Sequence, residues 1–249
     1  MNTIQENIAN LTSLWITASS FFKGHYVQDE INSCYVLDSQ WPNKIWLNNE
    51  DEIKIEDLSK ITELINLNSS KLTFSYFDKK PSNDNDLIIN NGFTKKGRQY
   101  GMSLELNHLF DVSIPLTLKK VVNSVDAKIW CTTFEKCFGY LISEETLNKT
   151  YHKINYFIIY SQDEVVGTIL LHFTRKTVGI HSLGILPVMR GKGFANQIMY
   201  QVLNESISLG MSLATLQASE MAKKMYQQIG FSIEFLIQHY QLEKIIHLL

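Results

Sequence analysis

The stretch "GILPVMRGKGFANQIM", residues 184–199, decides the fold, because an apolar run, a glycine turn and a helical pattern follow one another within it. The apolar run is of strand length and ends at Pro187. Apolar residues then recur at helical spacing from Ala195 to Ile207, and Gly210 supplies a C-terminal stop. The sequence therefore predicts a strand, a tight turn and a helix that begins near Phe194.

The turn between these two elements is "RGKGFA", residues 190–195. The first N–H groups of a helix have no partner inside the helix, and they lie at the positive end of its dipole. The glycines and the small alanine let phosphate oxygens approach the main chain, and the two cations add long-range attraction. The turn therefore predicts a pocket for a pyrophosphate, formed by Arg190, Gly191, Lys192, Gly193, Phe194 and Ala195.

By itself, a GxG turn before a helix is a weak signal, since tight turns also use glycine for positive φ without any ligand. The sequence contains neither the GxGxxG of dinucleotide-binding folds nor the GxxxxGK[ST] of phosphate loops. A Rossmann cofactor and a nucleoside triphosphate are therefore disfavoured.

The rest of the second half alternates strand-like runs with helical patterns. Helices are expected over residues 124–137 and after Ser143, which can cap the second one. The runs 154–162, 164–173 and 177–186 predict an antiparallel meander. Strands over 211–218 and 231–242 enclose a helix from Ser219 to Ile229 that ends at Gly230. This order predicts an α+β or mixed α/β fold.

The first half reads as a degenerate copy of this plan. Residues 91–106, "NGFTKKGRQYGMSLEL", superpose on residues 229–244, "IGFSIEFLIQHYQLEK", at an offset of 138. The same offset places Glu52 against Arg190, Ile55 against Gly193 and Asp57 against Ala195, so the first copy should repel an anion. Offsets of domain length are typical of duplication, and we expect two lobes, residues 1–111 and residues 112–249.

The composition of the 249 residues, 45% apolar and 19% charged, is that of a globular protein with one large or two modest cores. A net charge of −2 gives no basic face for nucleic acid. The charge is uneven, with 10 basic against 15 acidic residues up to residue 111 and 13 against 10 beyond it. An anionic ligand should therefore prefer the second half.

Neither a membrane segment nor a cysteine framework is expected. No apolar run approaches the length of a membrane span, and no cation precedes Lys23. A soluble, cytoplasmic protein without a membrane partner is therefore expected. Cys34, Cys131 and Cys137 show no CxxC and no paired histidine spacing, so they predict buried thiols rather than a disulfide or a metal site.

Two motifs resemble the GNAT superfamily of N-acetyltransferases. The acetyl-CoA signature of that family, [RQ]-x-x-G-x-[GA] after an apolar-x-Pro strand end, is matched by Arg190, Gly193 and Ala195. Its second signature, a strand and a helix carrying Ala and Tyr before Gly-Phe, is matched by "LATLQASEMAKKMYQQIGF", residues 213–231. The resemblance covers about residues 115–245. It implies the GNAT fold, in which helices flank a central, mostly antiparallel sheet.

The resemblance also implies acetyl-CoA as cosubstrate, without a metal. The pantetheine arm would lie between two splayed strands, residues 179–186 and 212–218, and would pair with the backbone of Leu183 and Ile185. The Ile185 N–H would face the thioester oxygen and stabilise the charge that develops there. Tyr226 matches the tyrosine that serves as general acid to the CoA sulfur, although it could simply pack on the inner face of its helix. Ser219 stands where the family often has a cofactor-contacting asparagine, and it is explained equally well as an N-cap.

The general base is the part of the pattern that departs from the family. Many relatives carry a glutamate on the strand before the glycine turn, and this position is Gly179 here. His181 lies two residues further on the same strand face and has an unperturbed pKa near 6.5, so it is the candidate base. His172 on the preceding strand is a lesser candidate. Either histidine could instead be a hydrogen-bonded core residue.

These observations predict an acetyl-CoA dependent N-acetyltransferase that moves the acetyl group to a primary amine by direct attack in a ternary complex. The second half would bind the cosubstrate and catalyse, and the first half would shape the acceptor site. The acceptor is a small-molecule or peptide amine that the sequence does not identify, and the oligomeric state stays open. Phe138, Gly139 and Tyr140 should wall the cleft, whereas Trp41, Pro42 and Trp46 either pack on the first sheet or face the cleft.

Two other functions remain open. A non-catalytic acyl-CoA binding or sensing module is favoured by the missing carboxylate at Gly179. An aminoacyl transferase is disfavoured by the intact "RGKGFA" turn, because aminoacyl-tRNA donors need no pyrophosphate pocket, and by the acidic net charge.

Overall fold

The computed structural model describes residues 2–48, 53–68, 72–79 and 85–243. The helices are α1 (Thr3–Ser20), α2 (Ile55–Asn68), α3 (Asp86–Asn90), α4 (Ser124–Phe138), α5 (Glu144–Thr150), α6 (Phe194–Ser208) and α7 (Lys223–Ile229). The strands are β1 (His25–Gln28), β2 (Ile31–Cys34), β3 (Lys44–Leu47), β4 (Thr73–Asp78), β5 (Phe93–Glu105), β6 (Thr117–Lys120), β7 (Asn155–Ser161), β8 (Glu164–Thr174), β9 (Thr177–Ile185), β10 (Leu213–Ala218) and β11 (Ser232–Leu242).

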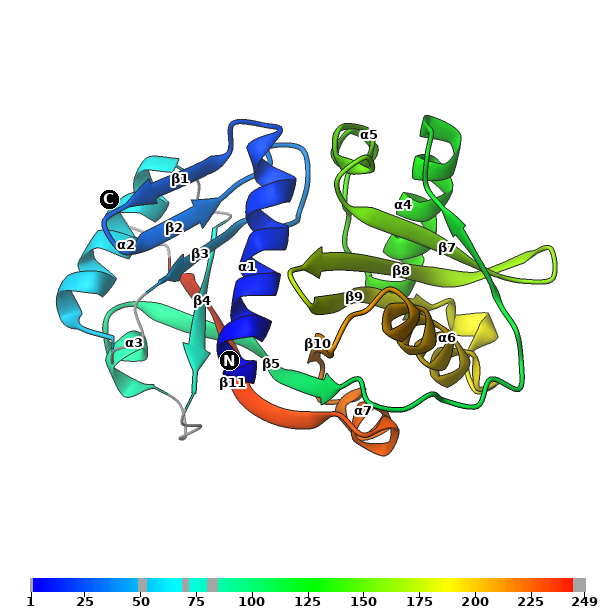
Figure 1. Ribbon diagram of the computed structural model, residues 1–249. Coiled ribbons are helices and arrows are strands. Elements are labelled where there is room, and N and C mark those ends of the chain that lie inside the picture. The colour runs from blue at the N-terminus through cyan, green and yellow to red at the C-terminus, as the bar shows by residue number, and fades with distance from the viewer. Residues whose placement is uncertain (1, 49–52, 69–71, 80–84, 244–249) are drawn as a thin grey trace.

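These strands form one continuous sheet in the order β1-β2-β3-β4-β11-β5-β10-β9-β8-β7-β6 (Figure 1). The pairs β3–β4 and β9–β10 are parallel, and the other neighbouring pairs are antiparallel. The predicted mixed α/β fold with a mostly antiparallel sheet is therefore confirmed, and so is the meander of β7, β8 and β9.

Helices cover both faces of the sheet, and the alternation of side chains along each strand assigns them to a face. In β3, Ile45 packs in a cluster with α2 and α3, whereas the next residue, Trp46, packs in a cluster with α1. In β8, Ile169 packs with α6, whereas Leu170 packs with α1 and α4. Helices α1, α4 and α5 thus lie on one face, with α1 across the middle of the sheet, and α2, α3, α6 and α7 lie on the other (Figure 1).

The two halves of the chain exchange their last strands. Strand β5 lies between β10 and β11, and it pairs with β11 from Phe93 opposite Leu242 to Ser103 opposite Ser232. The order α2-β4-α3-β5 in the first half matches α6-β10-α7-β11 in the second. This correspondence agrees with duplication, while the division at residue 111 stays a prediction, because the sheet itself has no break there.

Local sequence accounts for several element ends. The α4 helix begins at Ser124 as predicted and ends at Phe138, and Gly139 caps it with a φ of 76°, which suits a residue without a side chain. Ser143 caps α5 as predicted, since its Oγ accepts a hydrogen bond from the Thr146 N–H at 3.2 Å.

Two predicted element ends are wrong. Strand β9 ends at Ile185, one residue before the end of the predicted run 177–186 and two before Pro187. Proline has no N–H to donate to a ladder, and Pro187–Met189 forms a 3-10 turn instead. The last helix begins at Lys223 rather than Ser219, and Ala222 precedes it. Residues 219–222 form a turn in which the Ser219 Oγ accepts from the Ala222 N–H at 3.3 Å, and the Glu220 carboxylate lies 2.9 Å from the Arg98 guanidinium on β5.

The three cysteines are free thiols, buried at Cys34 and Cys131 and half-buried at Cys137. Within the described ranges, none of the helices combines the length and the apolar character that crossing a membrane requires.

Candidate active site

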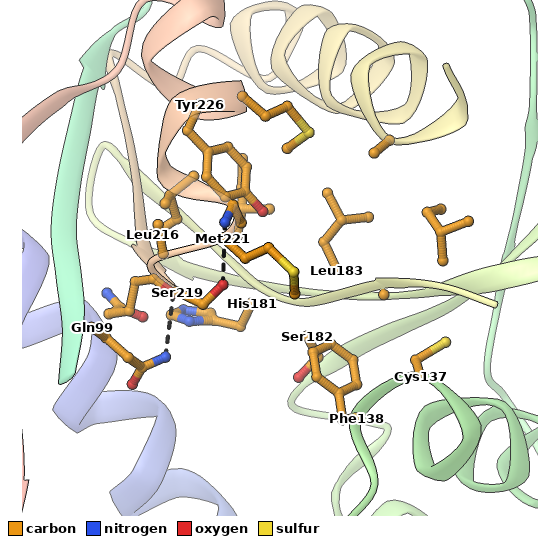
Figure 2. Close-up of a pocket in the computed structure, with 18 of the residues that line it drawn as sticks. Gln99, Cys137, Phe138, His181, Ser182, Leu183, Leu216, Ser219, Met221 and Tyr226 are labelled. Carbon is orange, nitrogen blue, oxygen red and sulfur yellow. Dashed lines mark hydrogen bonds between the residues drawn. The ribbon is translucent and has the colours of Figure 1, made fainter. Parts of the chain in front are cut away.

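A cavity of about 1000 Å³ opens where β9 and β10 separate (Figure 2). The two strands pair from Thr177 opposite Leu213 to Gly179 opposite Thr215 and diverge beyond that point. A bulge in β9 explains the divergence, since Ser182 has a φ of 53° and the register against β8 shifts there. The cavity is lined by α1, the end of α4, the glycine turn, α7 and several residues of the first half.

The glycine turn has the backbone that the sequence predicts. Gly191 and Gly193 both have a φ of 79°, and a Cβ at either position would meet no atom within 4 Å. Glycine is therefore required by the left-handed backbone rather than by packing, and open space remains beside it. Helix α6 begins at Phe194, and no side chain caps it among the described residues. The Asn196 Oδ1 in its first turn is buried without a hydrogen-bond partner in the same set, and Asn196 lines the cavity.

The two cations of the turn are held differently. The Arg190 side chain donates to the Ile185 carbonyl at 3.1 Å and to the Cys137 carbonyl at 3.3 Å. It thereby ties the turn to the end of β9 and to the last turn of α4, where a cation is favoured by the helix dipole. The exposed Lys192 has its Nζ 3.5 Å from the Met189 sulfur. Arg190 thus has a structural role that the sequence did not predict.

Tyr226 on α7 lines the cavity and is 8% exposed. Its ring packs edge-on against Phe231, and Figure 2 shows its hydroxyl directed into the space near Leu183 and Met221. Within the described part of the chain this hydroxyl has no hydrogen-bond partner. Burial raises the pKa of Tyr226 to about 12. The phenol is therefore protonated at neutral pH and has a proton to give.

The absence of a carboxylate at Gly179 has a steric cause. A Cβ at this position would lie 1.8 Å from the Asn10 Oδ1 and 2.4 Å from the His181 Nε2. Asn10 reaches β9 from α1, and its Nδ2 donates to the His172 carbonyl at 2.9 Å and to the Thr174 Oγ1 at 2.8 Å. An amide from the first half therefore fills the space above the strand, and any side chain at residue 179 would displace it.

We expect Gly179→Ala to lower the free energy of unfolding by about 2 kcal/mol, because the new methyl group overlaps Asn10. The matched control is Gly97→Ala in β5, where a Cβ meets nothing within 4 Å. Denaturant unfolding of both variants measures the difference. The cost of Gly179→Ala should shrink in an Asn10→Ala background, and equal costs for the two glycines would contradict the steric account.

The two candidate histidines are both hydrogen-bonded. The His181 Nε2 lies 3.2 Å from the Asn10 Oδ1, and burial, aided by the neighbouring His172, lowers the pKa of His181 to about 3. The imidazole lines the cavity but is neutral and weakly basic at neutral pH. His172 bonds the Ser13 hydroxyl at 3.1 Å, burial lowers its pKa to about 4, and it is not part of the cavity lining.

The predicted cleft wall is partly found in the cavity. Phe138 and Tyr140 line the cavity, whereas Gly139 caps α4. Trp41 and Pro42 also line it. Trp46 instead packs on Trp15 of α1, with the ring centroids 5.4 Å apart.

Several lining residues were missed from the sequence: Lys44, Gln99, Gln217 and His239. They are polar residues that face α1 from strands otherwise rich in apolar residues, and a polar residue at an inward position of a strand is the signal that could have found them. Of the predicted site residues, the cavity lining includes Ser219, Leu183, Ile185 and the turn residues Arg190, Gly191, Gly193, Phe194 and Ala195. Lys192 is not part of this lining. Over the described ranges, no group of three or more His, Cys, Asp or Glu side chains could hold a metal ion.

The chain was compared with protein families and with curated protein sequences. The model of the Acetyltransferase (GNAT) family matches residues 127–231, which run from α4 to the residue before β11. No curated protein sequence matches the chain significantly.

Solved structures match almost the whole chain. A GCN5-related N-acetyltransferase from Kribbella flavida superposes with a TM-score of 0.70 at 12% identity, over 97% of this chain and 96% of the other. A GCN5-related N-acetyltransferase from Sphaerobacter thermophilus superposes with a TM-score of 0.60 at 16% identity, over 86% of this chain and 76% of the other. A GCN5-related N-acetyltransferase-like protein from Streptococcus suis superposes with a TM-score of 0.55 at 15% identity, over 96% of this chain and 100% of the other. At such identities the likeness establishes the fold alone, and the family model adds that residues 127–231 match the Acetyltransferase (GNAT) family.

Proposed function

We propose that the chain transfers an acetyl group from acetyl-CoA to a primary amine by direct attack in a ternary complex. The observation that carries the proposal is the continuity of one cavity, which joins the open N-terminus of α6, the gap between β9 and β10 and the Tyr226 hydroxyl.

The residues present fit coenzyme A. The uncapped first turn of α6 and the open space at Gly191 and Gly193 suit a diphosphate. The diverging edges of β9 and β10 suit an extended arm, which would pair with the backbone at Leu183 and Ile185. Ser219 lines the same cavity and would contact the bound cosubstrate. When bound, acetyl-CoA supplies the activated acetyl group as a thioester.

The chain would supply a general acid for the leaving thiolate but no side-chain base for the attacking amine. Tyr226 holds a proton at neutral pH and would give it to the leaving sulfur. Ile185 would offer its N–H where negative charge develops. No Asp or Glu belongs to the cavity lining in the described ranges, and His181 binds a proton weakly. The attacking amine would therefore lose its proton to water rather than to a side chain, with His181 as a hydrogen-bonding residue beside it.

We assign the acceptor side to residues 1–111 and the cosubstrate side to residues 112–249, as the two lobes of a duplicated protein. In the first lobe, Glu56 and Asp57 occupy the first turn of α2, and the Asp57 carboxylate accepts the Lys54 N–H at 3.0 Å. An anion is disfavoured at this helix start, which corresponds to the glycine turn of the second lobe. Glu52, the predicted counterpart of Arg190, lies outside the described residues.

The weak basicity of His181 and the missing carboxylate favour a second candidate, a non-catalytic acyl-CoA binding module. The two functions differ in turnover. Purified protein is mixed with acetyl-CoA and a panel of small-molecule amines, amino acids and peptides, and the free thiol of CoA is measured. Acetyl transfer predicts release with at least one class of amine and none with Gly193→Glu. Release no greater than that of Gly193→Glu across the whole panel, with acetyl-CoA bound, would establish the binding module instead.

A further inference from the structure

The cavity extends well beyond the gap between β9 and β10, along the sheet face that α1 covers. Polar side chains from neighbouring strands line this extension in a row. The Gln99 Nε2 on β5 donates to the Gln217 carbonyl on β10 at 3.3 Å, and the Gln99 Oε1 lies 2.9 Å from the His239 Nε2 on β11. Lys44 on β3 continues the row at its far end.

Most members of this row have their hydrogen-bonding groups satisfied within the protein. The other ring nitrogen of His239, Nδ1, lies 3.1 Å from the Ser75 hydroxyl on β4, and the Gln217 side chain donates to the Asn7 Oδ1 on α1 at 2.7 Å. Burial, with the charge of Lys44 as a second cause, lowers the pKa of His239, so its ring is neutral. These hydrogen bonds hold the side chains of the row in place, and none of the groups in them is an anion that could pair with Lys44.

Lys44 differs from the rest of the row. Its half-buried side chain lines the cavity and has neither an ion pair nor a side-chain hydrogen bond among the described residues. The described lining offers no carboxylate as counter-ion. Burial lowers the pKa of the Lys44 ammonium to about 8, which shows that the surroundings disfavour the charge. A partly desolvated ammonium without a counter-ion is stabilised strongly when a ligand places an anion beside it.

We propose, on the basis of the proposed acetyl transfer, that the acceptor is an elongated amine whose far end carries an anionic group held by Lys44. The amine lies at the gap between β9 and β10, and the anion lies beside β3. A carboxylate is the simplest group of this kind.

The sheet sets the length of such an acceptor. From β10 to β3 the order passes β5, β11 and β4, which makes four strand intervals and about 19 Å at ordinary spacing. Because the lysine side chain and the reacting amine each cover part of this span, the acceptor is on the order of 10–15 Å long. Leu11, Trp15 and Trp41 line the same cavity, so the middle of the acceptor meets apolar side chains as well as the hydrogen-bonded polar row.

The test compares two matched series of amines, ω-amino acids and n-alkylamines of roughly four to ten carbons, a range whose longest members approach the required span. Specificity, kcat/KM, is measured for each with acetyl-CoA. For the wild type, the ratio of acid to alkylamine should rise with chain length to about tenfold or more. In Lys44→Met this ratio should fall to near one at every length, and Lys44→Arg should keep most of it.

Calorimetric binding of CoA to Lys44→Met separates this inference from the proposed function, since four strands of the sheet lie between β3, which carries Lys44, and β9, which leads into the glycine turn. The inference is overturned if the wild type has equal kcat/KM for alkylamines and ω-amino acids, or if the acid-to-alkylamine ratio is unchanged in Lys44→Met. Either result leaves the proposed acetyl transfer unaffected. If acetyl-CoA binds but no ω-amino acid is bound or acetylated, the inference is also overturned. If acetyl-CoA itself does not bind the wild type, the proposed function fails, and this inference fails with it.

Discussion

Gly193→Glu should weaken the binding of acetyl-CoA by about 100-fold or more. The substitution places a carboxylate at the uncapped start of α6, where the diphosphate would lie, and forces a residue with a side chain to a φ of 79°. The left-handed backbone alone costs about 1–2 kcal/mol of stability. Isothermal titration with acetyl-CoA measures the affinity, and thermal unfolding measures the strain.

Gly92→Glu is the matched control for this variant. Gly92 has a φ of 84°, a Cβ there meets no atom within 4 Å, and it follows α3 in the first half, away from the cavity. It should lose similar stability and keep its affinity for acetyl-CoA. A Gly193→Glu protein that binds as tightly as Gly92→Glu would remove the glycine turn from the binding site.

Tyr226→Phe should lower kcat by about 100-fold, with the affinity for CoA nearly unchanged. The variant removes one buried hydroxyl whose proton would go to the leaving sulfur. Because this hydroxyl has no hydrogen-bond partner among the described residues, its loss should not lower the free energy of unfolding. Steady-state kinetics on an acceptor found in the amine panel, together with calorimetry, separate the two quantities.

Tyr156→Phe serves as the comparison for the loss of a buried hydroxyl. Tyr156 is fully buried beneath α4, it bonds the Thr150 hydroxyl at 2.9 Å, and it does not line the cavity. This variant should lose stability and keep kcat. A Tyr226→Phe enzyme as fast as the wild type would exclude the tyrosine as general acid.

The second half could be predicted closely from the sequence because its signals are local. The glycines of the turn have a positive φ, which glycine adopts without steric cost, and Ser143 caps α5 through a contact three residues away. The start of α7 was predicted four residues too early, because the turn before it is stabilised by the long-range contact of Glu220 with Arg98 on β5.

The acceptor side could not be predicted, since it is built from contacts between distant segments. Asn10 and Gly179 are 169 positions apart, and the exclusion of a carboxylate at residue 179 depends on α1 crossing β9. The insertion of β5 between β10 and β11 brings Gln99 and His239 together, a pairing that no periodicity within either strand contains. Lys44 could not be predicted for the same reason. A single lysine in a short strand is expected to be exposed to solvent, and only the strand order places it beside the cavity.

Calorimetric titration of the wild-type protein with CoA, set against titration with pantetheine, tests the central claim most directly, because the two molecules share the arm and differ in the diphosphate and the nucleotide beyond it. Binding at the start of α6 predicts that CoA binds at least about tenfold more tightly than pantetheine, and that this advantage disappears in Gly193→Glu. Equal affinities for the two molecules, or no uptake of CoA at all, would contradict it.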